Sequence, residues 1–369
     1  MKVGNKLHEE AHMNLRDDVL RYSRFVGPSG AEDNVIRAFT EDLRSLGVEP
    51  SVDPLGNVSA ALTEAQPGYP HVMVTAHLDE VGVVVRKIED GGYLRIHRVG
   101  GTNDRVVAGQ RFVFLTTEGP VEGVVGVKAK HVSSPAELSA AVMIDDAYVD
   151  IMAVDKHEVT ALGVDVGTLG VFLAEPIIHN NFIRGKALDD RAGIAMLLEM
   201  ARRVCREPPR AGVTLVATVQ EEFSVRGGVP AARRVNPDLA FCLDIAIATD
   251  TPDLSYLGDV KLGGGPVITR FTRASLNGII PNPKLHRFVA DIAKTEGISV
   301  QNAVLQGGLT DGSFMQYEGN GIPTLDLGFA TRYTHTPVET CHLRDLEQGV
   351  DLLCAVLKHF PKDFDLSRG

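Results

Sequence analysis

The sequence predicts an α/β protein in which helices flank a mixed sheet and a small β-barrel domain is inserted into the chain. Three observations predict it. Strands alternate with amphipathic helices in both outer parts of the 369-residue chain, one early strand is apolar almost throughout, and the middle of the chain has few such helices. The expected α/β domain combines residues 1–85 and 175–369, and the expected inserted β-rich domain spans residues 86–174.

The first expected element is a helix at Ala31–Leu46, where apolar residues recur at helical spacing. Ser29, followed three residues later by Glu32, fits a capping box at its start, and Gly47 fits a C-terminal stop. The strands expected next are Asn57–Leu62 and the nearly continuous apolar run His71–Ala76. Such apolar strands belong in the middle of a sheet that is covered on both faces.

Between about Arg86 and Ala174, short β-like runs are separated by Gly-rich turns, which is typical of a small β domain. Alternation returns afterwards and favours a largely parallel or mixed sheet flanked by helices. The later elements expected are helix Arg191–Arg206, strands Val213–Val219 and Leu239–Leu243, helix Pro283–Glu296, strands Val300–Leu305 and Thr324–Leu327, and helix Asp345–His359.

The net charge and the composition argue against certain binding partners, namely nucleic acids and membranes. The net charge of −11 argues against a nucleic-acid partner, because no basic stripe offsets it. The segment MKVGNKLHEEAHMNLRDD is too polar for a secretory signal, and no apolar run reaches the roughly 18 residues that cross a bilayer. The four cysteines lack the close paired spacing of a zinc or redox motif. We therefore expect a cytoplasmic protein that binds neither nucleic acid nor membrane.

Four short segments place metal-type ligands where an apolar strand ends or a loop begins. They are VMVTAHLDE with His77, Asp79 and Glu80, GKALDDRAG with Asp189 and Asp190, TLVATVQEEF with Glu221 and Glu222, and AFCLDIA with Asp244 at the expected strand end. In open α/β sheets the carboxyl ends of the strands line the ligand crevice, so these groups could converge there. Carboxylates and imidazoles without cysteines favour a hydrolytic zinc, cobalt or manganese site.

Each segment also has a simpler explanation. A histidine after a strand is usually a hydrogen-bonded residue, paired acids at a helix start are usually caps, and an adjacent glutamate pair is usually a solvated turn. These explanations predict no relation among the four segments. Their recurrence at the ends of strands in one domain favours a shared site.

The segments AHLDEVGVVV, GKALDDRAG, VQEEFSVRGG and GIPTLDLGFATRYTHTPVE resemble those of the tetrahedral (TET) aminopeptidases, also called the glutamyl-aminopeptidase family. The resemblance is ordered and runs from Pro28–Asp33 to His342–Glu347, including Tyr148–Gly167 in the inserted domain. It implies a dinuclear metallo-exopeptidase that removes the N-terminal residue of peptides, using a water activated by two metal ions.

The resemblance also implies a set of metal ligands. His77 would bind one ion, and Asp189 would bridge both ions. Glu222 would be a terminal ligand to one ion and Asp244 to the other, and His335 would complete the shell of the second ion. The cofactors implied are two divalent ions per subunit, zinc first, with cobalt or manganese as alternatives. Only the resemblance singles out His335 among the twelve histidines.

Two further roles follow from the same resemblance. Glu221, next to a ligand, matches the general base that takes a proton from the attacking water. Asp79 matches the acid that hydrogen-bonds the imidazole of His77 and fixes its orientation. The family also suggests a cis peptide bond between Asp189 and Asp190.

The partners implied are peptide substrates and further copies of the chain, assembled as a tetrahedral dodecamer with a dimer as the alternative. The inserted domain would help to build that assembly. Three other functions stay open from the sequence: an N-acyl deacylase or deacetylase on the same scaffold, a glucanase, and a non-catalytic binding module. A glucanase would leave His77 and His335 without a role.

Overall fold

The computed structural model describes residues 14–368 and confirms an α/β architecture with a mixed sheet and a β-barrel. The strands of the large sheet are β1 (Ser51–Val52), β2 (Val58–Thr63), β3 (His71–His77), β12 (Gly212–Thr218), β13 (Leu239–Ile247), β14 (Val267–Ala274), β15 (Asn277–Ile279), β16 (Gln301–Gln306) and β17 (Thr324–Thr331). These nine strands follow the order β1-β2-β12-β3-β13-β17-β14-β15, with β16 paired to β14. Most of the polar N-terminal segment considered above lies outside the described residues.

Four neighbouring strands in the middle of the sheet, β12, β3, β13 and β17, run parallel to one another. Strand β3 is buried along nearly its whole length, which explains its continuous apolar sequence. Because the strands are parallel, their carboxyl ends lie at one edge of the sheet, where side chains from distant parts of the chain can meet.

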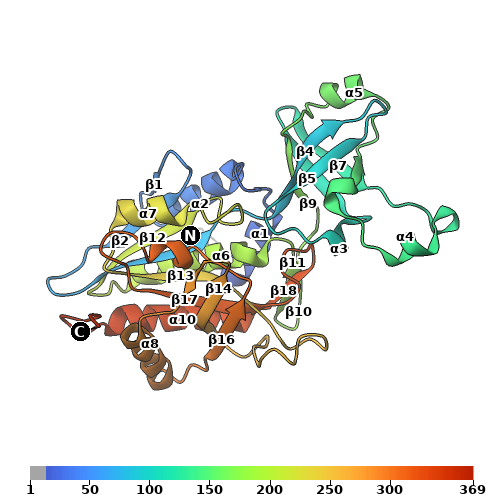
Figure 1. Ribbon diagram of the computed structural model, residues 1–369. Helices are drawn as coiled ribbons and strands as arrows, with labels where there is room; N and C mark the ends of the chain where they lie inside the picture. The colour runs from blue at the N-terminus through green and yellow to red at the C-terminus, as the bar shows by residue number, and fades with distance from the viewer. Residues whose placement is uncertain (1–13, 369) are drawn as a thin grey trace, which may run out of the picture.

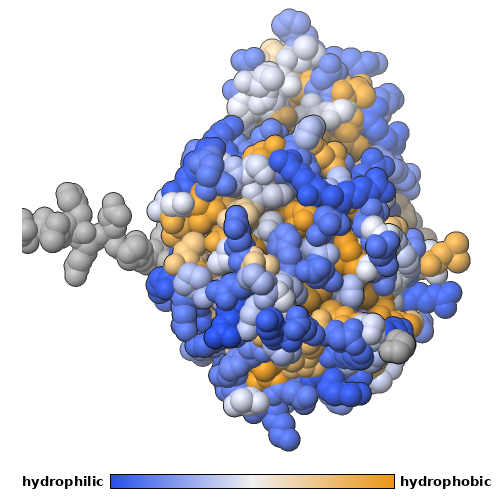
Figure 2. Space-filling model, turned by 90° about the vertical axis from the view of Figure 1, so that its left-hand side faces the viewer, coloured by the Kyte–Doolittle hydropathy of each residue, from blue (hydrophilic) through white to orange (hydrophobic). Residues whose placement is uncertain are grey.

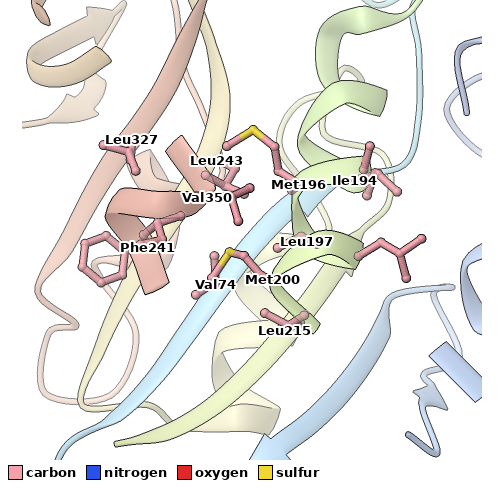
Figure 3. Close-up of a cluster of buried hydrophobic side chains, with 14 of the residues drawn as sticks. Val74, Ile194, Met196, Leu197, Met200, Leu215, Phe241, Leu243, Leu327 and Val350 are labelled. Carbon is pink, nitrogen blue, oxygen red and sulfur yellow. The ribbon is translucent and has the colours of Figure 1, made fainter. Parts of the chain in front are cut away.

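Helices cover both faces of this sheet. They are α1 (Leu15–Arg24), α2 (Asp33–Ser45), α6 (Leu188–Arg206), α7 (Gly228–Val235), α8 (Pro283–Thr295), α9 (Gly312–Met315) and α10 (Leu343–His359). On one face, Leu197 and Met200 of α6 and Val350 of α10 point toward Val74 and Phe241 of the strands (Figure 3). A smaller apolar cluster packs α7 and α9 against the opposite face. The parallel strands therefore lie between two layers of helices.

The second part of the molecule is a closed barrel that projects from one side of the α/β part (Figure 1). Its strands are β4 (Gly82–Ile88), β5 (Leu94–Val99), β6 (Arg111–Thr116), β7 (Gly119–Val125), β8 (Tyr148–Asp150) and β9 (Leu169–Phe172), closed in the order β4-β5-β8-β7-β6-β9. It has its own hydrophobic core. The short helices in this region are α3 (Asp104–Val107), α4 (Pro135–Ser139), α5 (Lys156–Ala161) and two 3-10 turns, Lys130–Val132 and Ile144–Asp146.

A small third sheet pairs the segment just after the barrel with a segment near the C-terminus. It consists of β10 (Ile177–His179), β11 (Phe182–Gly185) and β18 (Glu339–His342), in that order. Strand β11 leads directly into α6, and β18 leads into α10. The sheet therefore places two late segments of the chain beside each other at the edge where the parallel strands end.

Two local predictions were wrong. The capping box does not form: α2 begins at Asp33, its N-cap Glu32 makes no side-chain cap, and the hydroxyl of Ser29 donates instead to Asp79, at 2.5 Å. Both residues hydrogen-bond to loops of the site described below, and these tertiary partners outcompete the helix end. Asp244 does not end its strand, because β13 continues to Ile247 through its pairing with β17.

The surface of the molecule carries both hydrophilic and hydrophobic side chains. In the face seen in Figure 2, hydrophilic side chains are interspersed with hydrophobic patches, as on most folded proteins. Within residues 14–368, no helix combines the length and the apolar character that a membrane span requires.

Candidate metal centre

The structure brings the five predicted metal ligands together at the carboxyl edge of the parallel strands. His77 is the last residue of β3, and Asp244 lies near the end of β13. Glu222 follows β12, and His335 lies in the connection from β17 to β18. Asp189 lies at the start of α6, which packs across this sheet. Residues from five separate segments therefore lie close together: the sequence pattern indicated four of these segments, and only the resemblance indicated His335.

The ligand atoms form two groups that share one residue. His77, Asp189 and Asp244 make the first group, and Asp189, Glu222 and His335 make the second; within each group the ligand atoms lie within 4.8 Å of one another. Oδ1 of Asp189 lies 3.1 Å from Nε2 of His77, and Oδ2 lies 3.5 Å from Nε2 of His335. The two oxygens of this carboxylate therefore face two different imidazoles, which is the placement that a bridging ligand needs.

The two histidines are surrounded by acids, and their pKa values respond to this. Burial alone would lower the pKa of His77, but the carboxylates of Asp189 and Asp79 raise it well above its usual value. Burial also works against protonated His335, yet Glu222 and Asp189 raise its pKa to about 12. Shifts in this direction indicate that the site carries an excess of buried negative charge.

Divalent cations would compensate this excess of buried negative charge. The carboxylate of Asp244 has a pKa raised well above the usual range by burial, with Asp189 adding to the effect. Among the residues that the structure describes, Oε1 of Glu222 is buried and accepts no hydrogen bond, although Nε2 of His335 lies 3.2 Å away. Oxygen and imidazole ligands of this kind suit zinc, cobalt or manganese. The donor set therefore fits two ions that share Asp189.

Asp79 ties the glutamate pair to the first group. Its carboxylate accepts hydrogen bonds from the backbone N–H of Glu221 at 2.9 Å and of Glu222 at 3.0 Å, as well as from the hydroxyl of Ser29. Its Oδ1 lies 3.5 Å from Nδ1 of His77, while its own backbone carbonyl lies closer to that nitrogen, at 3.2 Å. Asp79 thus approaches Nδ1 of the imidazole with both its carboxylate and its carbonyl, and its carboxylate also fixes the backbone of the glutamate pair.

Glu221 lies beside the ligands without joining them. Its carboxylate oxygen Oε2 is 3.9 Å from Nε2 of His77, and Glu221 belongs to neither of the two ligand groups found in the described part of the chain. Burial raises the pKa of Glu221 well above its usual value, and Glu222 adds to this while His77 opposes it. A buried carboxylate with a raised pKa, next to the reacting centre, is suited to proton transfer.

Glu339 is a site residue that the sequence reasoning missed. Its Oε1 accepts a hydrogen bond from the backbone N–H of His335 at 2.7 Å, and its Oε2 accepts one from the backbone N–H of Asp189 at 3.0 Å. Burial, together with the nearby Asp189, raises its pKa to about 8. Glu339 therefore holds the backbones of two ligand residues together. Its position in THTPVE, shortly after His335, was the available signal.

Glu80 was singled out with His77 and Asp79 but has a different partner. Its two oxygens each lie 2.8 Å from Nζ of Lys186, and Oε1 lies 3.3 Å from a guanidinium nitrogen of Arg191. All three side chains are almost completely buried. This ion pair joins the loop that follows His77 to the segment that carries Asp189.

Several backbone conformations at the site are unusual for residues with side chains. Ala187, Gln220 and His335 all have positive φ angles, of 52°, 55° and 60°. Such conformations cost free energy and persist where the surrounding structure determines them, commonly at functional sites. The peptide bond between Asp189 and Asp190 is cis, as the resemblance suggested.

A buried centre of carboxylates and imidazoles at the carboxyl edge of a parallel sheet defines a metal-dependent hydrolase. The family model described as M42 glutamyl aminopeptidase matches residues 56–352, and the chain belongs to this family. It is a metal-dependent aminopeptidase, and the deacylase, glucanase and non-catalytic alternatives are not favoured.

The similarity extends over nearly the whole chain. SgcX of Escherichia coli (strain K12) is 38% identical over 91% of this chain and 92% of its own length. The lysyl aminopeptidase of Pyrococcus furiosus is 32% identical over 92% of this chain and 95% of its own length. Among solved structures, the TET1 peptidase of Pyrococcus horikoshii, which can assemble into a tetrahedron or a large octahedral shell, has a TM-score of 0.85. It is 30% identical and covers 94% of this chain and 100% of its own.

Proposed function

We propose that this aminopeptidase binds two divalent ions, with His77 and Asp244 on the first, Glu222 and His335 on the second, and Asp189 shared between them. The observation that carries the proposal is the sharing of Asp189 by two groups of ligand atoms. A carboxylate that bridges two ions needs both of its oxygens free to face them, and here each oxygen faces a different histidine. Zinc is the metal that we propose first, with cobalt and manganese as alternatives.

The residues around the ions have separate tasks in peptide hydrolysis. When bound, the two ions would polarise the scissile carbonyl and lower the pKa of the attacking water. Glu221 would accept the proton of that water and later deliver it to the leaving amine, because its carboxylate lies beside the ligands. Asp79 would hold His77 in place and fix the backbone of Glu221 and Glu222.

A substrate panel tests this function directly. We expect hydrolysis of aminoacyl and peptide substrates, loss of that activity after treatment with a chelator, and recovery when Zn²⁺, Co²⁺ or Mn²⁺ is added back. The panel should include N-acyl amino acids and a β-glucan as matched controls. Cleavage of N-acyl substrates alone, or activity that survives complete removal of metal, would contradict the proposal.

The two ligand groups predict different metal contents for two variants. Asp244→Asn should lose one ion per chain, because Asp244 belongs to the first group only. Asp189→Asn should lose both ions or bind both far more weakly, because Asp189 belongs to both groups. Elemental analysis after equilibrium dialysis gives the number of ions per chain. Equal losses in the two variants would show that the groups are not separate sites.

We further propose that the chain forms a homo-oligomer, with a tetrahedral dodecamer as the form to test first. The assembly of the similar TET1 peptidase supports this proposal. The inserted region, residues 86–174, would contribute to the contacts between copies. Light scattering separates a dodecamer from the alternative dimer. We propose the cytoplasm as the compartment, in keeping with the four free thiols.

A further inference from the structure

We infer that the barrel supplies a positioning residue for the second ion: the backbone of Gly101 orients the imidazole of His335. The inference rests on the proposed function, because it assigns a task toward an ion that His335 would bind. It gives the inserted barrel a role within each copy of the chain, in addition to any role in assembly.

The first observation is a hydrogen bond to the ring of His335. Its Nδ1 lies 3.1 Å from the carbonyl oxygen of Gly101, while its Nε2 faces Glu222 and Asp189. A carbonyl oxygen can only accept a hydrogen bond, so Nδ1 must carry the proton. The lone pair of the neutral ring is then on Nε2, which faces the shared carboxylate. Gly101 therefore selects the tautomer that can bind an ion.

The second observation is how closely the backbone of Gly101 approaches the imidazole. A Cβ atom at this position would lie 2.4 Å from Nδ1 and 2.6 Å from Cε1 of His335, well inside normal contact distances. The φ angle of Gly101 is not in the left-handed region, so its conformation does not require glycine. Glycine is required because there is no space for a side chain beside the imidazole ring. Any larger residue would force the imidazole away from its present position.

The neighbouring residue extends the contact to the other ligand of the second group. A Cβ atom on Gly100 would lie 3.3 Å from the backbone oxygen and 3.4 Å from Cβ of Glu222. The pair Gly100–Gly101 therefore lies against both ligands that belong to the second group alone. The three atoms nearest to a Cβ at either glycine belong to Val81, Glu222 or His335, and none belongs to His77 or Asp244, the ligands of the first group alone.

The glycine pair is anchored in the barrel. It follows the last residue of β5, and the buried Thr102 donates a hydrogen bond from its hydroxyl to the carbonyl of Gly82, the first residue of β4, at 3.0 Å. Glu339, in contrast, holds His335 by its backbone N–H and belongs to the α/β part. The α/β part thus fixes where His335 is attached, and the barrel fixes how its ring is turned.

The experiment compares Gly101→Ala with Gly91→Ala in the full-length protein, using Zn²⁺ alone as the probe. Gly91 is a matched control, since it is also in the barrel, has no left-handed φ angle, and a Cβ there would meet Tyr93 at an ordinary 3.6 Å. In Gly101→Ala we expect one of the two ions to bind roughly ten- to a hundredfold more weakly, as for other residues that orient a ligand. Gly91→Ala should match the unaltered protein.

Two further variants separate positioning from a general loss of structure. Thr102→Val removes the anchoring hydroxyl without adding bulk, and it should weaken the same ion to a smaller degree. Gly101→Ala combined with Asp244→Asn should bind no ion tightly, because each change affects a different site. Circular dichroism checks that each variant is folded.

Full binding of two ions by Gly101→Ala would overturn the inference, as would equal weakening of both ions. Neither result would contradict the proposed function. That function is contradicted separately if the unaltered chain binds no ion or if Asp189→Asn keeps both ions.

Discussion

Replacing Glu221 with glutamine should lower kcat by roughly a hundred- to ten-thousand-fold, the range that a positioned general base contributes. Glutamine keeps the shape of the side chain but cannot accept the proton of the attacking water. The fold and the metal content should stay unchanged, because Glu221 belongs to neither group of ligand atoms and its backbone N–H still donates to Asp79. The loss should therefore appear in the rate and not in the binding of ions.

The neighbouring residue provides the sharpest contrast. Glu222→Gln alters a member of the second ligand group, so it should weaken the binding of one ion as well as lower the rate. Glu64→Gln, at an exposed position outside the site, is the control for a change of glutamate to glutamine and should leave both properties unaltered. Measurement of kcat, KM and metal content for all three variants tests the assignment. Near-normal turnover by Glu221→Gln would show that another group acts as the base.

Much of the fold could be predicted because its elements have clear periodicity. The buried strand β3 and the late helix α10 were expected from continuous and helical apolar patterns, and they form within a few residues of the expected bounds. The capping box failed because Ser29 has a partner, Asp79, that is distant in the sequence. The barrel begins with β4 at Gly82, before the expected boundary at residue 86, since this strand pairs only with barrel strands. No local pattern contains these long-range partners.

The site was predictable to the extent that its chemistry is carried by acids and histidines at strand ends. His77 and the Glu221–Glu222 pair stood out in this way, and the Asp189–Asp190 pair stood out just before a helix. His335 lies in a connection after β17 and was found only through the family resemblance. Glu339 acts on the backbone of other residues, and Gly101 acts by having no side chain. Neither task can be deduced from a single sequence, although the position of Glu339 shortly after His335 was a signal for its place in the site. They become visible only when the chain is folded.

The largest effect on stability is expected for Lys186→Met, which should reduce the free energy of unfolding by about 3 kcal/mol or more. Nζ of Lys186 lies 2.8 Å from both carboxylate oxygens of Glu80 and 2.7 Å from the carbonyl of Phe25. Methionine fills a similar volume but offers none of these hydrogen bonds. The change therefore leaves the buried carboxylate of Glu80 with only some of its hydrogen-bonding and ionic partners.

The loss in free energy of unfolding should lie near the lower end of the range for a broken buried ion pair, because Glu80 keeps two other partners. Arg191 lies 3.3 Å from its Oε1, and the backbone N–H of Gly27 donates to the same oxygen at 3.2 Å. Burial lowers the pKa of Lys186, and Glu80 opposes this by raising it. The two buried opposite charges therefore stabilise each other.

Denaturation in urea measures the effect, and Lys284→Met is the matched control. Lys284 also pairs with a carboxylate, that of Asp365 at 2.9 Å, but both side chains are largely exposed, so water replaces the lost contact. Because Glu80 follows His77 by three residues and Lys186 precedes Asp189 by three, Lys186→Met should also weaken the binding of Zn²⁺. If the two variants unfold at the same urea concentration, the buried ion pair does not stabilise the part of the fold that carries these ligands.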